Sequence, residues 1–237
     1  MLAIERLEAY RGRVQVLRGV SLRVEGGEAV TLVGRNGAGK TTTIETIMGL
    51  LPARAGEVSF RGNAITRLQA YQRALLGIGY APEDAGIFPE LTVAENFRIC
   101  EWLKRSANGK ETGSVNIEER IFGVFPEVRA FMNRQGLHLS GGQKKMVAVA
   151  RAMALSPSIL LLDEPFEGLA PVVVSRFIDA VKKIKGMGIS LLIAESNLMT
   201  AIRIADRLYA IDRGEIIFQG TPREAMENQD VMHTLRG

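Results

Sequence analysis

Short apolar runs bounded by turn residues recur towards both ends of the chain, and such runs predict β-strands. In the opening third they predict strands over Leu2–Tyr10, Val14–Leu17, Ser21–Val24, Glu28–Val33, Glu57–Arg61 and Ile78–Ala81. After Pro157 the runs Ile159–Asp163 and Ile189–Glu195 are apolar almost throughout. This pattern is typical of strands that are buried on both faces of a parallel sheet.

Helical spacing of apolar residues separates these two groups of strands. A first helix is predicted from Lys40 to Leu50, because Pro52 cannot continue it. The region Leu91–Leu155 is mostly helical in pattern, apart from the polar stretch Arg105–Ser114, which we expect to be a surface loop. A further helix over Pro171–Gly186 joins the last two strands, and this alternation implies a parallel sheet with right-handed crossovers.

The order of elements predicts an α/β fold with an antiparallel β layer at the N-terminus. The length of 237 residues favours one large domain. We expect a core formed by residues 1–88 and 156–237, with a helical subdomain inserted at 89–155.

Composition narrows the class of protein. Hydrophobic residues make up 46% and charged residues 24%, which argues against a disordered or fibrous chain. No apolar run approaches the roughly 18 residues that would predict a membrane span. Cys100 is the only cysteine, which excludes an internal disulfide and favours a reducing, cytoplasmic location. The net charge of +4 is a small basic excess spread along the chain. It favours a mixed, solvated surface over a basic face for phosphates or lipid headgroups.

A glycine-rich loop between the fourth strand and the first helix fits the P-loop pattern G-x-x-x-x-G-K-[ST]. Its glycines let backbone N–H groups turn towards phosphate oxygens, and the following helix presents its positive end to the same anion. The lysine neutralises the β- and γ-phosphates, and the threonine hydroxyl suits Mg²⁺. The predicted nucleotide-binding residues of this loop are Gly34, Arg35, Asn36, Gly37, Ala38, Gly39, Lys40, Thr41 and Thr42.

Two carboxylates end the apolar run after Pro157. A buried strand beside the P-loop strand would deliver Asp163 to a metal ion, and would place Glu164 near the γ-phosphate to polarise a water molecule. An apolar strand ending in acidic residues is common, so the pattern gains its meaning from the P-loop.

A serine and two glycines open the helix that precedes this strand, and they form a second candidate phosphate cradle. One nucleotide needs only one P-loop, so a second cradle predicts a second phosphate contact; a plain turn is the alternative. The motif consists of Leu139, Ser140, Gly141, Gly142 and Gln143.

This combination resembles the ATP-binding subunits of ABC transporters, over essentially the whole chain. Residues 34–41 and 159–164 are similar to the Walker A and Walker B motifs, and residues 139–143 to the signature motif. Tyr10 lies where the family places an aromatic ring against adenine, although a lone tyrosine is more often a packing residue. The resemblance implies a P-loop NTPase fold with a RecA-like parallel-sheet core, and ATP and Mg²⁺ as cofactors.

Finer features resemble the branched-chain amino-acid importers, and within them the shorter, LivF-type subunit. They are the stretches Gly168–Pro171, Phe88–Asn96 and Gly220–Ala225. The resemblance therefore implies an ATPase that powers amino-acid import.

Two positions depart from the family pattern. Glu83 replaces the usual glutamine of the Q-loop, and Ser196 replaces the usual switch histidine. We predict metal ligation by Thr41, Asp163 and Glu83, and catalytic roles for Glu164 and Ser196. A serine is shorter than histidine, so we expect slow turnover at this chain's own site; the alternative is that Asn197 or water replaces the histidine.

The family resemblance also implies partners. Two such subunits pair head to tail, with ATP between residues 34–42 of one and residues 140–143 of the other. An integral membrane permease docks near Glu83–Val93, which would place the chain at the cytoplasmic face of the membrane, and no nucleic-acid partner is expected. The alternatives are a non-transport ABC ATPase of translation or DNA repair, and a slow nucleotide sensor.

Overall fold

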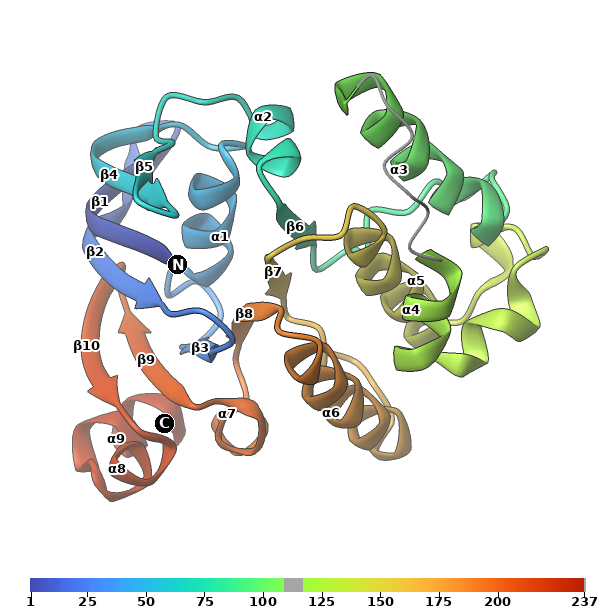
Figure 1. Ribbon diagram of the computed structural model, residues 1–237. Helices are drawn as coiled ribbons and strands as arrows, with labels where there is room; N and C mark the ends of the chain where they lie inside the picture. The colour runs from blue at the N-terminus through green and yellow to red at the C-terminus, as the bar shows by residue number, and fades with distance from the viewer. Residues whose placement is uncertain (109–116, 237) are drawn as a thin grey trace.

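Two β-sheets stack in the computed structural model, which describes residues 1–108 and 117–236 (Figure 1). The smaller sheet is antiparallel, in the order β2-β1-β4-β5. Its strands are β1 (Leu2–Arg11), β2 (Val14–Val24), β4 (Ala53–Phe60) and β5 (Asn63–Ala64). It is the predicted N-terminal antiparallel layer.

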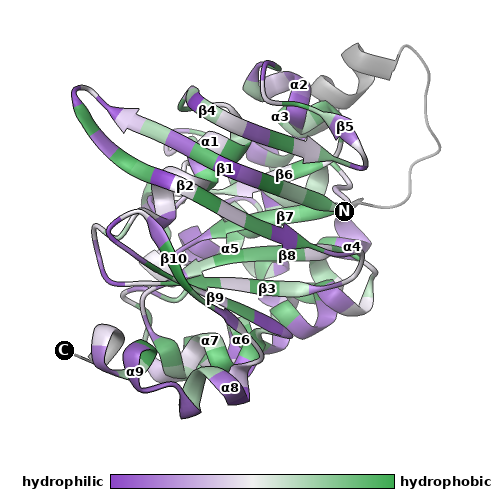
Figure 2. Cartoon of the chain, turned by 90° about the vertical axis from the view of Figure 1, so that its left-hand side faces the viewer, coloured by the Kyte–Doolittle hydropathy of each residue, from purple (hydrophilic) through white to green (hydrophobic). Residues whose placement is uncertain are grey.

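The larger sheet has the order β10-β9-β3-β8-β7-β6 and is parallel except for β10. Its strands are β3 (Ala29–Val33), β6 (Ile78–Ala81), β7 (Ile159–Asp163), β8 (Ser190–Glu195), β9 (Arg207–Asp212) and β10 (Glu215–Gly220). Every residue of β3, β7 and β8 is buried, and for β7 and β8 this was predicted from their apolar runs. Figure 2 shows these strands as mainly hydrophobic, whereas β1 and β2 alternate.

Helix α1 (Lys40–Met48) lies between the two sheets, where it contacts β2 on one side and β7 and β8 on the other. The opposite face of the parallel sheet is covered by α5 (Gly141–Ala154), α6 (Pro171–Gly186) and α7 (Leu198–Ile204). Because β3 and β7 both flank β8, the loops that follow these strands meet at one edge of the sheet.

A group of helices lies beside the sheets, on the right of Figure 1. It contains α3 (Val93–Asn108), α4 (Ile117–Val124), the short 3₁₀ helices Pro126–Phe131 and Gly136–His138, and the first part of α5. A small helix, α2 (Ala70–Leu75), lies between α1 and this group. The helices expected between Leu91 and Leu155 are therefore present.

The C-terminal elements pack on the edge of the parallel sheet. Helices α8 (Pro222–Glu227) and α9 (Gln229–Arg236) follow β10, and Val231 of α9 shares a small core with Val33 and Ala210. Among the described residues, no helix combines the length and the apolar character that crossing a membrane requires.

Some predicted boundaries are wrong. Val14–Leu17 and Ser21–Val24 belong to one continuous strand, because Gly19, at φ 78°, forms a bulge opposite β1 and does not break the pairing. Residues 105–108 of the expected surface loop continue α3. The rest of that loop, from 109 to 114, lies outside the described residues.

Candidate functional site

The loop of residues 34–39 connects β3 to α1, as the P-loop pattern predicts. A side chain at Gly34 is excluded, because a Cβ atom there would lie 2.5 Å from the carbonyl oxygen of Ile211. Gly39 has φ 112° and immediately precedes Lys40, the first residue of α1. The N-terminal end of α1 therefore adjoins the glycine-rich loop.

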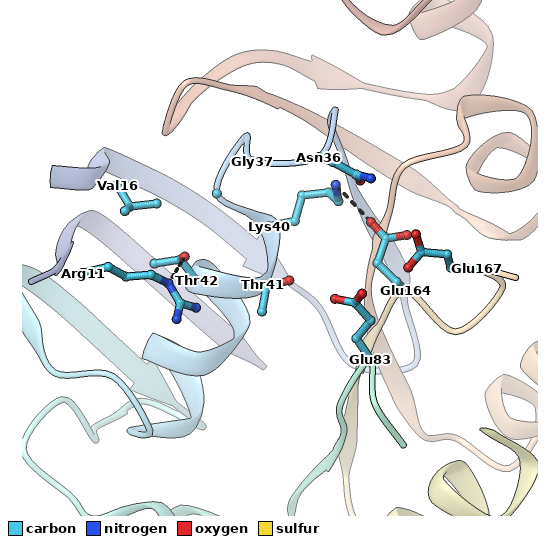
Figure 3. A pocket seen from close by; sticks show the side chains of 11 residues that line it. Arg11, Val16, Asn36, Gly37, Lys40, Thr41, Thr42, Glu83, Glu164 and Glu167 are labelled. Atoms are coloured by element: carbon cyan, nitrogen blue, oxygen red, sulfur yellow. Dashed lines mark hydrogen bonds and ion pairs between the residues drawn. The ribbon is translucent and has the colours of Figure 1, made fainter. Parts of the chain in front are cut away.

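Lys40 is buried beneath this loop. Its ammonium group donates to the carbonyl oxygens of Gly34, at 2.7 Å, and Arg35, at 3.0 Å. The same group pairs with the Glu164 carboxylate at 3.0 Å, the dashed line drawn from Lys40 in Figure 3. The loop therefore holds a desolvated positive charge at the position where a P-loop lysine meets phosphate oxygens.

Asp163 and Thr41 form the second feature of the site. The Thr41 hydroxyl donates to Asp163 Oδ1 at 3.1 Å, whereas Asp163 Oδ2 is buried without a hydrogen-bond partner within residues 1–108 and 117–236. Burial raises the pKa of Asp163 to about 6, and the Thr41 hydrogen bond opposes that rise. A hydroxyl and a buried carboxylate with one free oxygen fit Mg²⁺, which prefers hard oxygen ligands.

Glu164 is held in an unusual conformation. Its φ is 45°, in the left-handed region that non-glycine residues rarely adopt. Oε2 of Glu164 accepts hydrogen bonds from the Ser196 N–H at 3.1 Å and the Ser196 hydroxyl at 3.2 Å. The structure therefore joins the two residues predicted as catalytic, and the shorter serine side chain reaches Glu164 directly.

Glu195 is a residue of the site that the sequence interpretation missed. It is buried at the end of β8, and its Oε1 accepts from the N–H groups of Ser196, at 3.0 Å, and Asn197, at 2.9 Å. Burial raises the pKa of Glu195 to about 7. The available signal was an apolar run ending in an acidic residue, the same signal that identified Asp163.

A cavity of about 450 Å³ opens over the P-loop (Figure 3). Its walls combine predicted residues with others that were not predicted. They are Arg11, Val16, Asn36, Gly37, Gly39, Lys40, Thr41, Thr42, Glu83, Glu164 and Glu167. Glu83 faces other carboxylates here, and partial burial together with the Glu167 carboxyl raises its pKa.

Arg11 contributes to this cavity, whereas Tyr10 is not among the residues lining it. Arg11 Nε donates to the Thr42 hydroxyl at 3.1 Å, and the guanidinium also pairs with Glu45. The sequence predicted a nucleotide contact at Tyr10, one position before Arg11. The Tyr10 side chain is 37% exposed, so it is not a buried packing residue. Nothing in the local pattern distinguishes Arg11 from other surface arginines of the chain.

The residues of the signature motif do not line this cavity in their own chain. Ser140 caps α5, because its Oγ accepts from the Gln143 N–H at 3.3 Å and its N–H donates to Gln143 Oε1 at 2.9 Å. Ser140 and Gly141 are exposed, and a Cβ atom on Gly141 would meet nothing within 4 Å. A Cβ atom on Gly142 would lie 3.3 Å from Val173 of α6, and Leu139 is buried. The end of α5 thus presents open backbone to the outside.

Comparison with known proteins identifies the family. The family model described as ABC transporter matches residues 17–167. The chain is 34% identical to the lipopolysaccharide export system ATP-binding protein LptB of Escherichia coli, over 97% of this chain and 94% of LptB. It is 30% identical to the high-affinity branched-chain amino acid transport ATP-binding protein BraG of Pseudomonas aeruginosa, over 100% of both chains.

The fold comparison agrees. An ATP-binding cassette solved as a dimer in a post-hydrolysis state, bound to ADP and Pi, superposes with a TM-score of 0.81 and 25% identity. That match covers 94% of this chain and 99% of the cassette. The predicted P-loop NTPase fold is confirmed. The chain belongs to the ABC transporter family, as an ATP-binding cassette ATPase.

Proposed function

We propose that this chain is the ATP-hydrolysing subunit of an ABC importer for branched-chain or other amino acids. The observation that carries the ATPase part is that Lys40, Thr41 and Glu164 line one cavity over the P-loop, where Lys40 pairs with Glu164. Asp163 is joined to this group by its hydrogen bond with Thr41. Bound Mg²⁺ would be held by Thr41 and Asp163, with Glu83 as a further carboxylate, and would neutralise phosphate charge. The Glu164 carboxylate polarises the attacking water, and Ser196 orients that carboxylate.

Two copies of the chain, or this chain and a similar subunit, pair head to tail in this proposal. The open N-terminus of α5 supports it, because Ser140 and Gly141 offer backbone and hydroxyl groups to a phosphate from outside their own cavity. The dimeric, ADP-bound cassette with the same fold adds support.

A membrane permease is the second proposed partner, and it would hold the chain at the cytoplasmic face of the membrane. Large apolar side chains are exposed on α2, on α3 and in the segment between them. They are Tyr71, Leu75, Leu76, Phe88 and Trp102. Exposed apolar groups on these elements, which precede and follow Glu83 in the chain, suit the docking of a short amphipathic segment.

The most specific part of the proposal is the class of molecule that the transporter carries. The motif Gly168–Pro171 and the full-length similarity to BraG favour an amino-acid importer, whereas LptB, which is comparably similar, belongs to a lipopolysaccharide export system.

Deletion of the coding sequence, with uptake of radiolabelled leucine as the readout, separates these two classes. Loss of uptake, restored by the wild-type chain and not by the Lys40→Ala variant, is the expected result. Normal uptake of leucine and other amino acids, together with a defect in the outer surface lipids, would contradict amino-acid import.

A further inference from the structure

Lys145 is a partly buried lysine that the ATPase mechanism does not use. It lies in the second turn of α5, the helix whose N-terminus is the signature motif. Its ammonium group donates a hydrogen bond of 2.5 Å to the main-chain carbonyl oxygen of Glu164. The side chain also lines a second cavity, of about 500 Å³, together with Thr41, Asp163, Glu83 and Glu167.

Both main-chain groups of Glu164 are therefore engaged. The Glu164 N–H donates to the Ala194 carbonyl oxygen at 3.0 Å. The Glu164 carbonyl accepts from Lys145 and, at the longer distance of 3.3 Å, from the Glu167 N–H. Glu164 is also the residue with φ 45°, a conformation that persists only where its surroundings hold it. Without the Lys145 bond, the Glu164 carbonyl loses its short, charged donor and keeps the longer, neutral bond from the Glu167 N–H, so the peptide that follows Glu164 is held less firmly.

The surroundings of Lys145 act on its charge in two opposite directions. Burial lowers the pKa of Lys145, and the carboxylates of Glu167, Glu164, Glu195 and Glu83 oppose that effect. In its protonated form the lysine is a charge-assisted hydrogen-bond donor, and such a bond is stronger than a neutral one.

We infer that Lys145 is a positioning residue for the catalytic carboxylate, which it sets through the main chain of Glu164. This inference rests on the proposed role of Glu164 in ATP hydrolysis. It also gives α5 two functions, because one end of the helix offers the signature motif to the partner's nucleotide and its second turn fixes the chain's own Glu164.

Lys145→Met is the direct test, because methionine keeps the length of the side chain as far as Cε and removes the donor. We expect kcat for Mg-ATP hydrolysis by the full chain to fall about tenfold to a hundredfold, since a hydrogen bond to a charged group is lost. KM for ATP and the equilibrium affinity for ATP stay within about threefold of wild type, because the phosphate-binding groups are untouched. Lys145→Arg, which keeps a charged donor, restores most of kcat.

Lys183→Met is the matched control. Lys183 of α6 also donates to a main-chain carbonyl, that of Gly123 in α4 at 2.9 Å, and it does not line either of the two cavities described above. The rate of ATP hydrolysis by Lys183→Met is expected to equal that of wild type. If Lys145→Met does not fold, Lys145→Gln takes its place, because the glutamine side chain is one bond shorter and its amide stops short of the Glu164 carbonyl. The same result is expected of it: a lower kcat with KM for ATP close to that of wild type.

Three results would overturn the inference. They are wild-type kcat in Lys145→Met, a loss of ATP affinity as large as the loss of kcat, and recovery of kcat when Glu83→Gln is added to Lys145→Met. Recovery of kcat in the double variant would mean that Lys145 acts only by offsetting the negative charge of the Glu83 carboxylate. If the wild-type chain itself neither binds nor hydrolyses ATP, the proposed function fails instead.

Discussion

At the scale of single residues, the site is a set of buried carboxylates held beside two lysines. Asp163, Glu164 and Glu195 end neighbouring strands or follow them directly, and all are almost fully buried. Lys40 pairs with the Glu164 side chain and Lys145 binds the Glu164 main chain. The arrangement concentrates negative charge where a metal ion and a phosphate are expected. Because these carboxylates repel one another and are buried, the site lowers the stability of the folded chain.

Glu195 should make the stability of the protein depend on pH. Its pKa of about 7 in the folded chain lies above the ordinary glutamate value, so folding takes up a proton between these two values. Stability therefore falls as pH rises from about 4 to about 7 and then levels off. In Glu195→Gln this loss is absent, so the variant gains about 3 kcal/mol relative to wild type between pH 4.5 and pH 8.

Urea denaturation at the two pH values measures this gain. Glu57→Gln, at an exposed position of β4, is the control and should show no such difference. An equal free-energy difference between Glu195→Gln and wild type at both pH values would show that Glu195 is ionised in the folded chain at pH 4.5 already.

Ser196 gives the second prediction at this scale. Its hydroxyl is engaged with Glu164 and its side chain is short. We therefore predict that Ser196 does not supply the γ-phosphate contact expected of a switch histidine at this position. Ser196→His should raise ATP hydrolysis by the isolated chain about tenfold or more, the value of one added hydrogen bond to a charged group. Ser196→Ala should be slower than wild type. An unchanged rate in Ser196→His would show that the serine site is already complete.

At the scale of elements, the boundaries predicted for β6, β7 and α6 agree with the structure. Strands β6 and β7 are short and almost wholly apolar, and Pro171 starts α6. Strand β2 was divided in the prediction, because a bulge at Gly19 looks like a turn in sequence. Arg11 and Lys145 were not predicted as site residues, since their partners Thr42 and Glu164 are remote in sequence. Local patterns identify residues on one loop, whereas contacts between elements depend on packing.

The capping box of α5 allows its structural and functional roles to be separated. Ser140→Ala loses the cap and should cost about 1 kcal/mol of stability. Ser140→Asp keeps a side-chain acceptor for the Gln143 N–H, so its stability should match wild type. Its carboxylate would however repel the partner's γ-phosphate, and ATP hydrolysis should fall at least tenfold. Thermal melts and ATPase assays on both variants measure the two effects. Normal hydrolysis by Ser140→Asp would limit Ser140 to capping.

At the scale of the whole molecule, the stacking of the two sheets on α1 explains why the cavity is formed by distant segments. Strands β1 and β2 contribute Arg11 and Val16, the parallel sheet contributes the P-loop and Glu164, and the segment after β6 contributes Glu83 (Figure 3). The residues at the open end of α5 do not line this cavity. A second molecule is therefore needed to complete the phosphate contacts in the proposed mechanism.

Glu164→Gln tests the central claim, that this cavity hydrolyses ATP with Glu164 as the group that polarises water. The amide keeps the shape of the side chain but is a much weaker base. The measurement is sedimentation velocity of the variant with Mg-ATP, alongside its rate of phosphate release. We predict ATP affinity close to wild type, phosphate release at least a hundredfold slower, and a stable dimer that appears only with ATP. Phosphate release at the wild-type rate from a monomeric variant would contradict the account.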